Sequence, residues 1–318
     1  MESQLERTAP PADMPIPDRL NAMITIFVFC AGVALLLLGS WLEWWPAVLA
    51  VGVLFSYLLL TNYALLHESA HHNLHSRPVL NRLLGTLAGM LFPCPYSMIE
   101  AMHQGHHLRN RTDYEMFDLY YATESRVVRF VQWYGILCGF FWPVVPLGAV
   151  LFAGCPAILR TRLITGARSA SYLVGDIRQD RIRAIRWEVL ATVLLFGLLF
   201  WLGGLKWQNT LFLYGCFAFN WSTRQYIGHA FTKRDVIEGA YNLRHNRVMS
   251  WVLMNSQWDL NHHRHPEVSW YYLPRLARET DDPQPSYIRQ YWRLWRGPRL
   301  NTEPAPESLR ELPLSIHS

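Results

Sequence analysis

Long apolar runs constrain this chain more than any other feature of its sequence. Residues 22–42 carry no charge, and residues 46–66, 187–205 and 209–226 are similar in length and nearly uncharged. A helix needs about 20 apolar residues to cross the hydrocarbon core of a bilayer. A backbone within lipid must also satisfy its own hydrogen bonds, as a helix does. These runs predict an all-α, polytopic membrane protein with four transmembrane helices.

Three histidine clusters lie outside the apolar runs. Their sequences are HESAHH at residues 67–72, HQGHH at 103–107 and DLNHHRH at 259–265. Residues at i, i+3 and i+4 share one face of a helix, so each cluster presents several imidazoles together. Imidazole suits iron, zinc and copper, and three clusters supply more ligands than one tetrahedral zinc uses. We expect a multinuclear metal site, with two irons, at the edge of a membrane. Its candidate ligands are His67, His71, His72, His103, His106, His107, His262 and His263.

Three further residues are candidates for the same site. His229 follows the fourth apolar run, at the membrane depth expected of the clusters, and is a candidate ligand. Gln225 lies one turn before His229 and is a candidate for holding a metal-bound water. Asp259 precedes His262 by three residues, and it either binds metal or orients a ligating histidine. Surface or outer positions are expected for His75, His245 and His265, and the candidate outer carboxylates are Glu68, Glu100, Asp113 and Asp235.

Two interrupted apolar segments decide the topology. Residues 79–96 contain an arginine, two glycines and two prolines, and residues 128–153 contain Pro143 and Pro146. If residues 128–153 crossed once, His229 and the third cluster would lie on the opposite side of the membrane from His67. We therefore expect both segments to be re-entrant or interfacial. Every cluster then lies on the same side as the arginine-rich segment 160–186, which is the cytoplasmic side because such loops stay inside.

The ends of the chain differ from its middle. Residues 1–20 are polar and proline-rich, without the basic start and cleavage site of a signal peptide, and we expect a cytoplasmic tail. Residues 21–280 form the membrane domain with a histidine-rich catalytic cap. Residues 281–318 are expected to hold an interfacial aromatic and basic helix at 287–296 and a disordered end at 304–318. The formal charge of +5 indicates contact with lipid headgroups rather than nucleic acid, since no RNA-binding or phosphate-binding motif is present.

The clusters together resemble the histidine boxes of the membrane fatty acid desaturase and hydroxylase superfamily. HESAHH and HQGHH are similar to its first two boxes, and residues 260–274 are similar to its third box with the following P-x-W-x-x-L-P segment. Gln225-x-x-x-His229 is similar to its Asn-x-x-x-His element. Asp259 stands where the family has His or Gln, and Gln225 stands where it has Asn. The resemblance covers about residues 20–280.

This resemblance implies a non-haem diiron enzyme of the bacterial inner membrane. Such an enzyme uses O₂ to attack an unactivated C–H bond of a fatty acyl chain, by desaturation in the first instance. Hydroxylation and alkene-forming decarboxylation are the alternatives. The chain has no haem motif, flavin fold or iron–sulfur cysteine set. A separate electron donor of ferredoxin, rubredoxin or cytochrome type, with its reductase, is therefore an expected partner.

Two interpretations compete outside this superfamily. His67-Glu68-Ser-Ala-His71 matches the HExxH motif of zinc proteases, but a protease leaves the other two clusters unexplained. A metal transporter or haem-binding protein is the non-enzymatic alternative. Transporters place ligands near the middle of the bilayer, whereas these histidines lie beyond the ends of the apolar runs.

Overall fold

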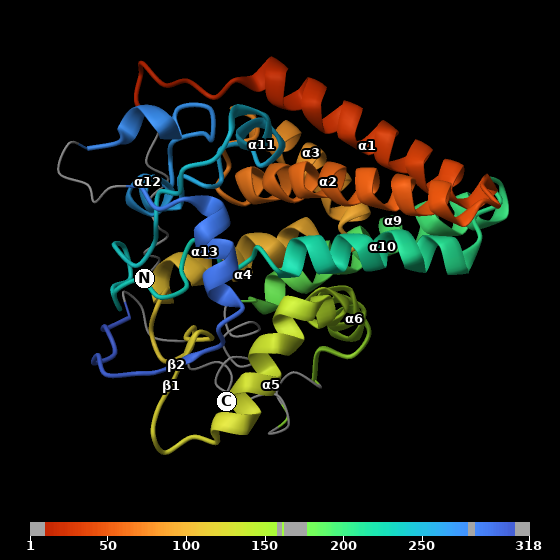
Figure 1. Cartoon of the computed structure of the whole chain (residues 1–318). Coiled ribbons are helices and arrows are strands. Elements are labelled where there is room, and N and C mark those ends of the chain that lie inside the picture. The colour runs from red at the N-terminus through yellow and green to blue at the C-terminus, as the bar shows by residue number, and fades with distance from the viewer. Residues whose placement is uncertain (1–9, 158–160, 162–176, 279–283, 309–318) are drawn as a thin grey trace.

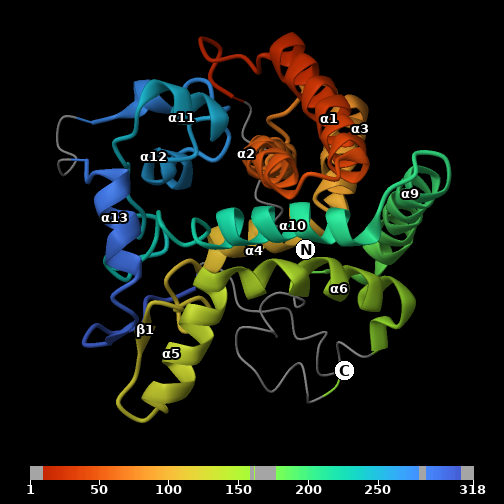
Figure 2. The same ribbon diagram turned by 45° about the vertical axis from the view of Figure 1, so that its right-hand side comes forward.

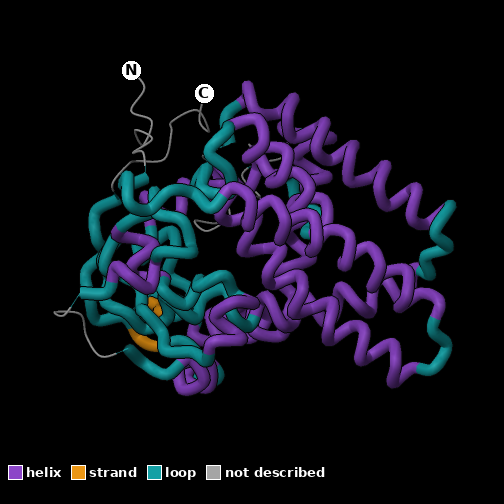
Figure 3. Tube along the Cα trace, turned by 90° about the horizontal axis from the view of Figure 1, so that it is seen from above, coloured by secondary structure: helices purple, strands orange, loops and turns teal. Residues whose placement is uncertain are grey.

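The computed structural model describes residues 10–157, 161, 177–278 and 284–308. Its long helices extend to one side of the molecule, and loops with a short strand pair gather at the other (Figures 1 and 3). The all-α class is confirmed. The arginine-rich segment at 160–186 and the expected disordered end fall largely outside the described residues.

Two antiparallel helical hairpins form the frame of the molecule. The first consists of α1 (Asp18–Trp41) and α2 (Trp45–Ala70), and the second of α9 (Ile182–Trp201) and α10 (Trp207–Ser222). Pro46 lies in the first turn of α2, where its missing N–H costs no helical hydrogen bond. Helix α2 lies between α1 and α10 (Figure 2) and buries one face along most of its length. Gly52 allows close contact there, since a Cβ would lie 2.9 Å from the sulfur of Cys216.

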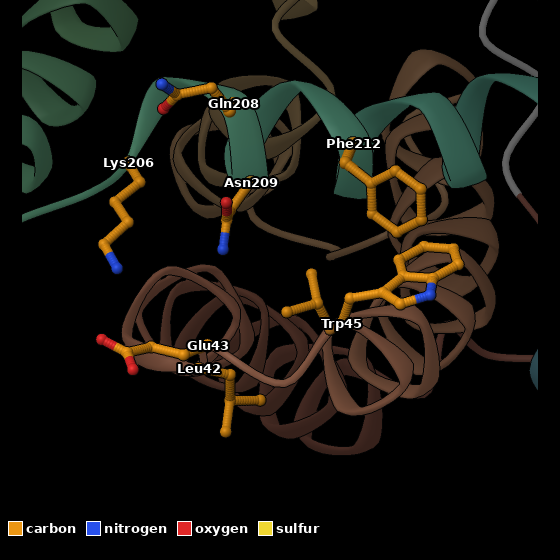
Figure 4. A pocket seen from close by; sticks show the side chains of 8 residues that line it. Leu42, Glu43, Trp45, Lys206, Gln208, Asn209 and Phe212 are labelled. Atoms are coloured by element: carbon orange, nitrogen blue, oxygen red, sulfur yellow. The ribbon is translucent and has the colours of Figure 1, made fainter.

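The tips of the two hairpins meet at the end away from the histidines. Trp41 Nε1 donates to the Gly203 carbonyl at 3.3 Å, and Asn209 Nδ2 donates to the Gly39 carbonyl at 2.6 Å. A cavity of about 400 Å³ lies beside this junction, and Glu43 and Lys206 face one another across its mouth (Figure 4). Both hairpins therefore begin and end on the side of the molecule that carries the histidine clusters.

A pair of short helices returns the chain to the second histidine cluster. Helix α3 (Pro78–Leu91) leads inward and α4 (Tyr96–Arg109) leads back. Their junction lies halfway along the frame, since Leu91 packs on Gly32 of α1 and its carbonyl accepts from Tyr214 of α10 at 2.9 Å. Two short helices therefore stand where a re-entrant or interfacial element was expected, at residues 79–96.

The interrupted segment 126–154 is a bent helix. It comprises α5 (Arg126–Gly135), a π-helical turn η1 (Ile136–Phe140) and α6 (Phe141–Gly154). Gly139 supplies the bend with a φ of +96°. Beyond the bend, Phe141 stacks on Trp221 and Trp142 stacks on Tyr214, so α6 lies along α10 (Figure 2).

Four helices have the length and apolar composition to cross a membrane, as expected in number. They are α1, α2, the continuous stretch Arg126–Gly154 and α9, whereas we expected residues 209–226 in place of 126–154. With 16 residues, α10 is about 24 Å long, shorter than the ~30 Å hydrocarbon core. The four apolar helices indicate association with a membrane.

Short elements build the cap around the histidines. They are η3 (Gln179–Arg181), α11 (Arg247–Val252), α12 (Asp259–Arg264), η4 (Leu273–Leu276) and α13 (Tyr287–Leu294). The strands β1 (Leu119–Tyr120) and β2 (Arg299–Leu300) pair in parallel. Helix α13 buries Tyr287, Gln290 and Leu294 and exposes Ile288 and Trp292. Helix α13 therefore packs against the cap through its buried face.

Candidate metal centre

The histidines of the three clusters converge at the cap end of the helical frame. His67 lies in the last turn of α2 and His71 directly follows that helix. Helix α4 carries the second cluster, and α12 carries the third. His229 lies in the turns after α10. Segments far apart in the sequence therefore supply imidazoles to one region.

These imidazoles form two groups. Site A consists of His67, His71, His103 and His262, and site B consists of His106, His229 and His263. Within each site the candidate ligand atoms all lie within 4.8 Å of one another. The sites adjoin, since the ring centroid of His103 in site A lies 5.4 Å from that of His106 in site B.

His107 lies between the two groups. Its Nε2 is 3.1 Å from Nε2 of His103 and 3.1 Å from Nε2 of His262, both in site A. Its ring centroid is 4.4 Å from that of His263 in site B. His107 is therefore placed to complete site A beside the boundary with site B.

Burial keeps most of these imidazoles neutral. Desolvation lowers the pKa of His103, His107, His262 and His263 well below the ordinary histidine value, and neighbouring histidines lower it further. Desolvation also lowers the pKa of His229, although Asp259 acts against it. A neutral imidazole keeps a lone pair for a metal ion.

The packing of the nitrogen atoms fits bound metal ions. His71 Nε2 and His262 Nδ1 are buried without a hydrogen-bond partner among the described residues. Such atoms carry a desolvation cost unless something compensates them. His107 Nε2 also faces two other Nε2 atoms at hydrogen-bond distance, and a neutral ring has one N–H to share. Metal ions bound among these nitrogens would give the unpartnered atoms a bond and would account for the Nε2 atoms that face one another.

Outer contacts orient two histidines of site B. Glu115 Oε1 lies 2.6 Å from His106 Nδ1, and the Gly239 carbonyl lies 3.1 Å from His229 Nδ1. Both contacts leave Nε2 directed at the site. Burial lowers the pKa of His106, but the Glu115 carboxylate outweighs burial and raises it. Sequence spacing does not reveal Glu115, because this residue follows a turn at Arg111, whose φ is +62°, and has no helical spacing to the cluster.

Asp259 borders site B. Its Oδ2 lies 3.1 Å from His229 Nε2, and its Oδ1 lies 4.0 Å from His263 Nε2. Gly228 permits this position, since a side chain there would collide with the Asp259 carboxylate. Gln225 lines the cavity that adjoins the site.

The other predicted residues belong to neither site, and of these Glu68 borders site A, with its Oε1 3.8 Å from His67 Nδ1. His72 is not in either group, and its Nε2 lies 3.4 Å from Glu100 Oε1. Glu68, next to His67, accepts the backbone N–H of Trp270 at 3.0 Å. That contact occupies the carboxylate that a zinc protease would use as its general base. His75, His245 and His265 contact Asp18, Tyr287 and Glu267, while Asp113 and Asp235 contact Arg234 and the backbone of Ile237.

An apolar cavity of about 260 Å³ opens from the histidines into the helical frame. This volume is just below the ~300–1,000 Å³ of typical small-molecule sites. His67, His103, His106 and His229 form part of its wall. Most of the remaining wall is apolar or aromatic, with residues including Leu60, Tyr63, Phe92, Ile99, Met102, Phe141, Val145 and Trp221. A flexible hydrocarbon segment fits such a space beside the candidate ligands.

Comparison with known proteins identifies the family. The family model described as fatty acid desaturase matches residues 39–295, more than half of the chain. A search of curated proteins finds no significant match. The matched range includes every histidine of sites A and B. The resemblance seen in the histidine boxes is thereby confirmed, and the chain belongs to the fatty acid desaturase family.

Proposed function

We propose that this protein is a membrane-bound diiron oxidoreductase that uses O₂ to desaturate a fatty acyl chain. The observation that carries the proposal is the meeting of site A, site B and His107 with the inner end of an apolar cavity. Family membership supports oxidation of a fatty acyl substrate.

Iron is the metal that suits both the ligands and the reaction. A tetrahedral zinc site takes four ligands, and the four histidines of site A alone provide that number before site B is counted. Histidine nitrogens also suit non-haem iron. Bound iron supplies the redox chemistry with O₂ that removes hydrogen from an unactivated C–H bond.

The ligand set we propose includes one carboxylate. Site A with His107 binds one ion, and His106, His229, His263 and Asp259 bind the other. Asp259 stands where the superfamily pattern has His or Gln, so the second ion has an oxygen ligand. His72 was a candidate ligand, and we now place it outside the set because it lies beside Glu100.

The protein's own groups position the acyl chain and limit access of water. Tyr63, Phe92, Phe141 and Trp221 surround the cavity and hold a hydrocarbon segment against the histidines. Glu115 and the Gly239 carbonyl hold the two imidazoles of site B in fixed orientations. Gln225 extends from the cavity wall and supplies an amide for a water beside site B.

Electrons must come from a separate protein, because the sequence has no motif for haem, flavin or an iron–sulfur cluster. We propose a ferredoxin, a rubredoxin or a cytochrome as the donor, with its own reductase. We further propose the bacterial inner membrane as the location, with the metal centre on the cytoplasmic side. The arginine-rich sequence at 160–186 supports this orientation.

The test is product analysis with purified protein in lipid nanodiscs, supplied with iron, fatty acids, O₂ and a reducing system. We expect two irons per chain and an unsaturated product by mass spectrometry. His263→Ala should lose iron and reduce turnover by more than about 100-fold, because it removes a ligand of site B. Arg126→Ala, on α5 away from the site, is the matched control and should keep its iron content and its turnover.

Other outcomes would replace the proposal. Hydroxylated or shortened alkene products would keep the diiron chemistry and change the reaction. One zinc per chain with peptide hydrolysis would establish the protease interpretation. Full turnover by protein stripped of iron would end the proposal altogether.

A further inference from the structure

Arg224 lies in the wall of the apolar cavity beside the histidines, and its positive charge has no acidic partner among the described residues. Its Nε donates to Asn220 Oδ1 at 2.9 Å, and its Nη1 donates to the Tyr287 hydroxyl at 3.2 Å. Its guanidinium also lies 5.6 Å and 5.7 Å from the ring centroids of Tyr287 and Tyr291. All of these partners are neutral.

The acidic residues of the same cavity are engaged elsewhere. Asp259 contacts His229, and Glu115 contacts His106. No ion pair joins Arg224 to a carboxylate within 4.0 Å in the described part of the chain. A partly buried charge without a counter-charge is costly unless an anion completes the site.

The groups around Arg224 suit an anion with two oxygen atoms. A planar guanidinium binds a carboxylate through two parallel hydrogen bonds. The Tyr287 hydroxyl, which accepts from Arg224, still has its own proton to donate. Gln225, Ser256 and Gln257 also line the cavity, so its wall contains polar groups beside Arg224 and Tyr287 as well as apolar ones.

We propose that Arg224 and Tyr287 bind the carboxylate of a free fatty acid, so that the substrate enters as the acid and not as a thioester or a phospholipid. This inference rests on the proposed function, because it names the head group of the substrate for that reaction. A thioester carbonyl offers no charge to balance the guanidinium. A carboxylate supplies the missing charge while its hydrocarbon tail fills the apolar part of the cavity.

Binding measurements test the inference without any need for turnover. Radiolabelled lauric acid, methyl laurate and lauroyl coenzyme A are titrated onto the full-length protein in neutral-lipid nanodiscs. The wild type should bind lauric acid more tightly than the other two. Arg224→Gln should weaken lauric acid binding by about 10- to 100-fold, because a hydrogen-bonded charge pair is lost, and should leave methyl laurate binding within about twofold.

Two further variants separate recognition from folding. Tyr287→Phe keeps the ring that packs on Arg224 and removes only the hydroxyl, so it should weaken binding of the acid by about 3- to 10-fold and spare the ester. Arg289→Gln, on the exposed face of α13, removes an equal charge outside the cavity and should leave both affinities unchanged.

Each outcome bears on one proposal. Equal loss of acid and ester binding in Tyr287→Phe, or unchanged acid binding in Arg224→Gln, would overturn the inference and leave the diiron oxidation standing. Tighter binding of lauroyl coenzyme A, or displacement of lauric acid by anionic phospholipid vesicles, would assign Arg224 to a different anion and would also overturn it. Selective acid binding without any oxidation of acyl chains would support the inference while the proposed function failed.

Discussion

Neighbouring histidines at the end of α2 have opposite surroundings. His71 ends the helix with a φ of −87°, and its ring lies 4.5–4.7 Å from the rings of His103, His107 and His262. His72 has a φ of +61°, which turns its side chain away toward Glu100. The change in backbone conformation between these two residues separates a member of site A from a histidine outside both groups.

Replacement of each histidine by asparagine tests this separation. Asparagine tolerates a positive φ better than most residues, so the backbone at position 72 is preserved. His71→Asn should lose iron from site A and reduce turnover by more than about tenfold. His72→Asn should keep its iron and stay within about twofold of the wild type. Iron analysis and turnover measure both, and iron loss from His72→Asn alone would reverse the assignment.

The helical bend between α5 and α6 shapes the cavity at the level of the element. Gly139 packs against the backbone of Phe219, and a Cβ there would lie 3.0 Å from the Phe219 nitrogen. The bend places Ile136 and Phe141 in the cavity wall. Both the positive φ and the close contact therefore require glycine at position 139.

Gly139→Ala should destabilise the protein by about 1–3 kcal/mol, because alanine resists the left-handed conformation and meets the Phe219 backbone. Gly148→Ala is the matched control in α6, since no atom lies within 4 Å of its Cβ position. That variant should be neutral or up to ~1 kcal/mol more stable, as expected for alanine in a helix. Thermal unfolding in nanodiscs measures both, and equal transitions would show that the bend tolerates a side chain.

At the scale of the whole molecule, the joined hairpin tips and the metal centre lie at opposite ends of the helical frame (Figure 1). Glu43 lies at the tips, and Lys233 follows the His229 turn at the other end. If both helices of each hairpin cross the inner membrane, the exposed residues Glu43 and Lys233 lie on opposite sides of that membrane.

Thiol labelling tests that orientation. Glu43→Cys and Lys233→Cys are made in a background that lacks the native cysteines. A membrane-impermeant maleimide should label position 43 in spheroplasts and should label position 233 only after permeabilisation. The reverse pattern would place the metal centre outside the cytoplasm, and labelling of both in spheroplasts would contradict a membrane-crossing frame.

The helices and the faces that carry the histidines could be predicted from local periodicity and from the apolar runs of the sequence. The uncharged runs are long enough to require helices in lipid, because a backbone there must bond to itself. Helical spacing placed His67 with His71, and His103 with His106 and His107, since side chains three and four residues apart share a face. The inward and outward course of α3 and α4 followed from the need to return the second cluster to the side of the first.

Contacts between distant segments decided the rest. The packing of α4, α10, α12 and α13 divides the histidines into sites A and B and leaves His72 outside both groups. It also brings Glu115 to His106 and Arg224 to Tyr287. Sequence spacing carries no information about such contacts, because the intervening turns adopt positive φ values and irregular paths that no repeat encodes. The sequence alone determined the apolar helices and the three histidine clusters that gather at one end of them. Only the tertiary structure decided which of them share a site, because that depends on the packing of segments that are remote along the chain.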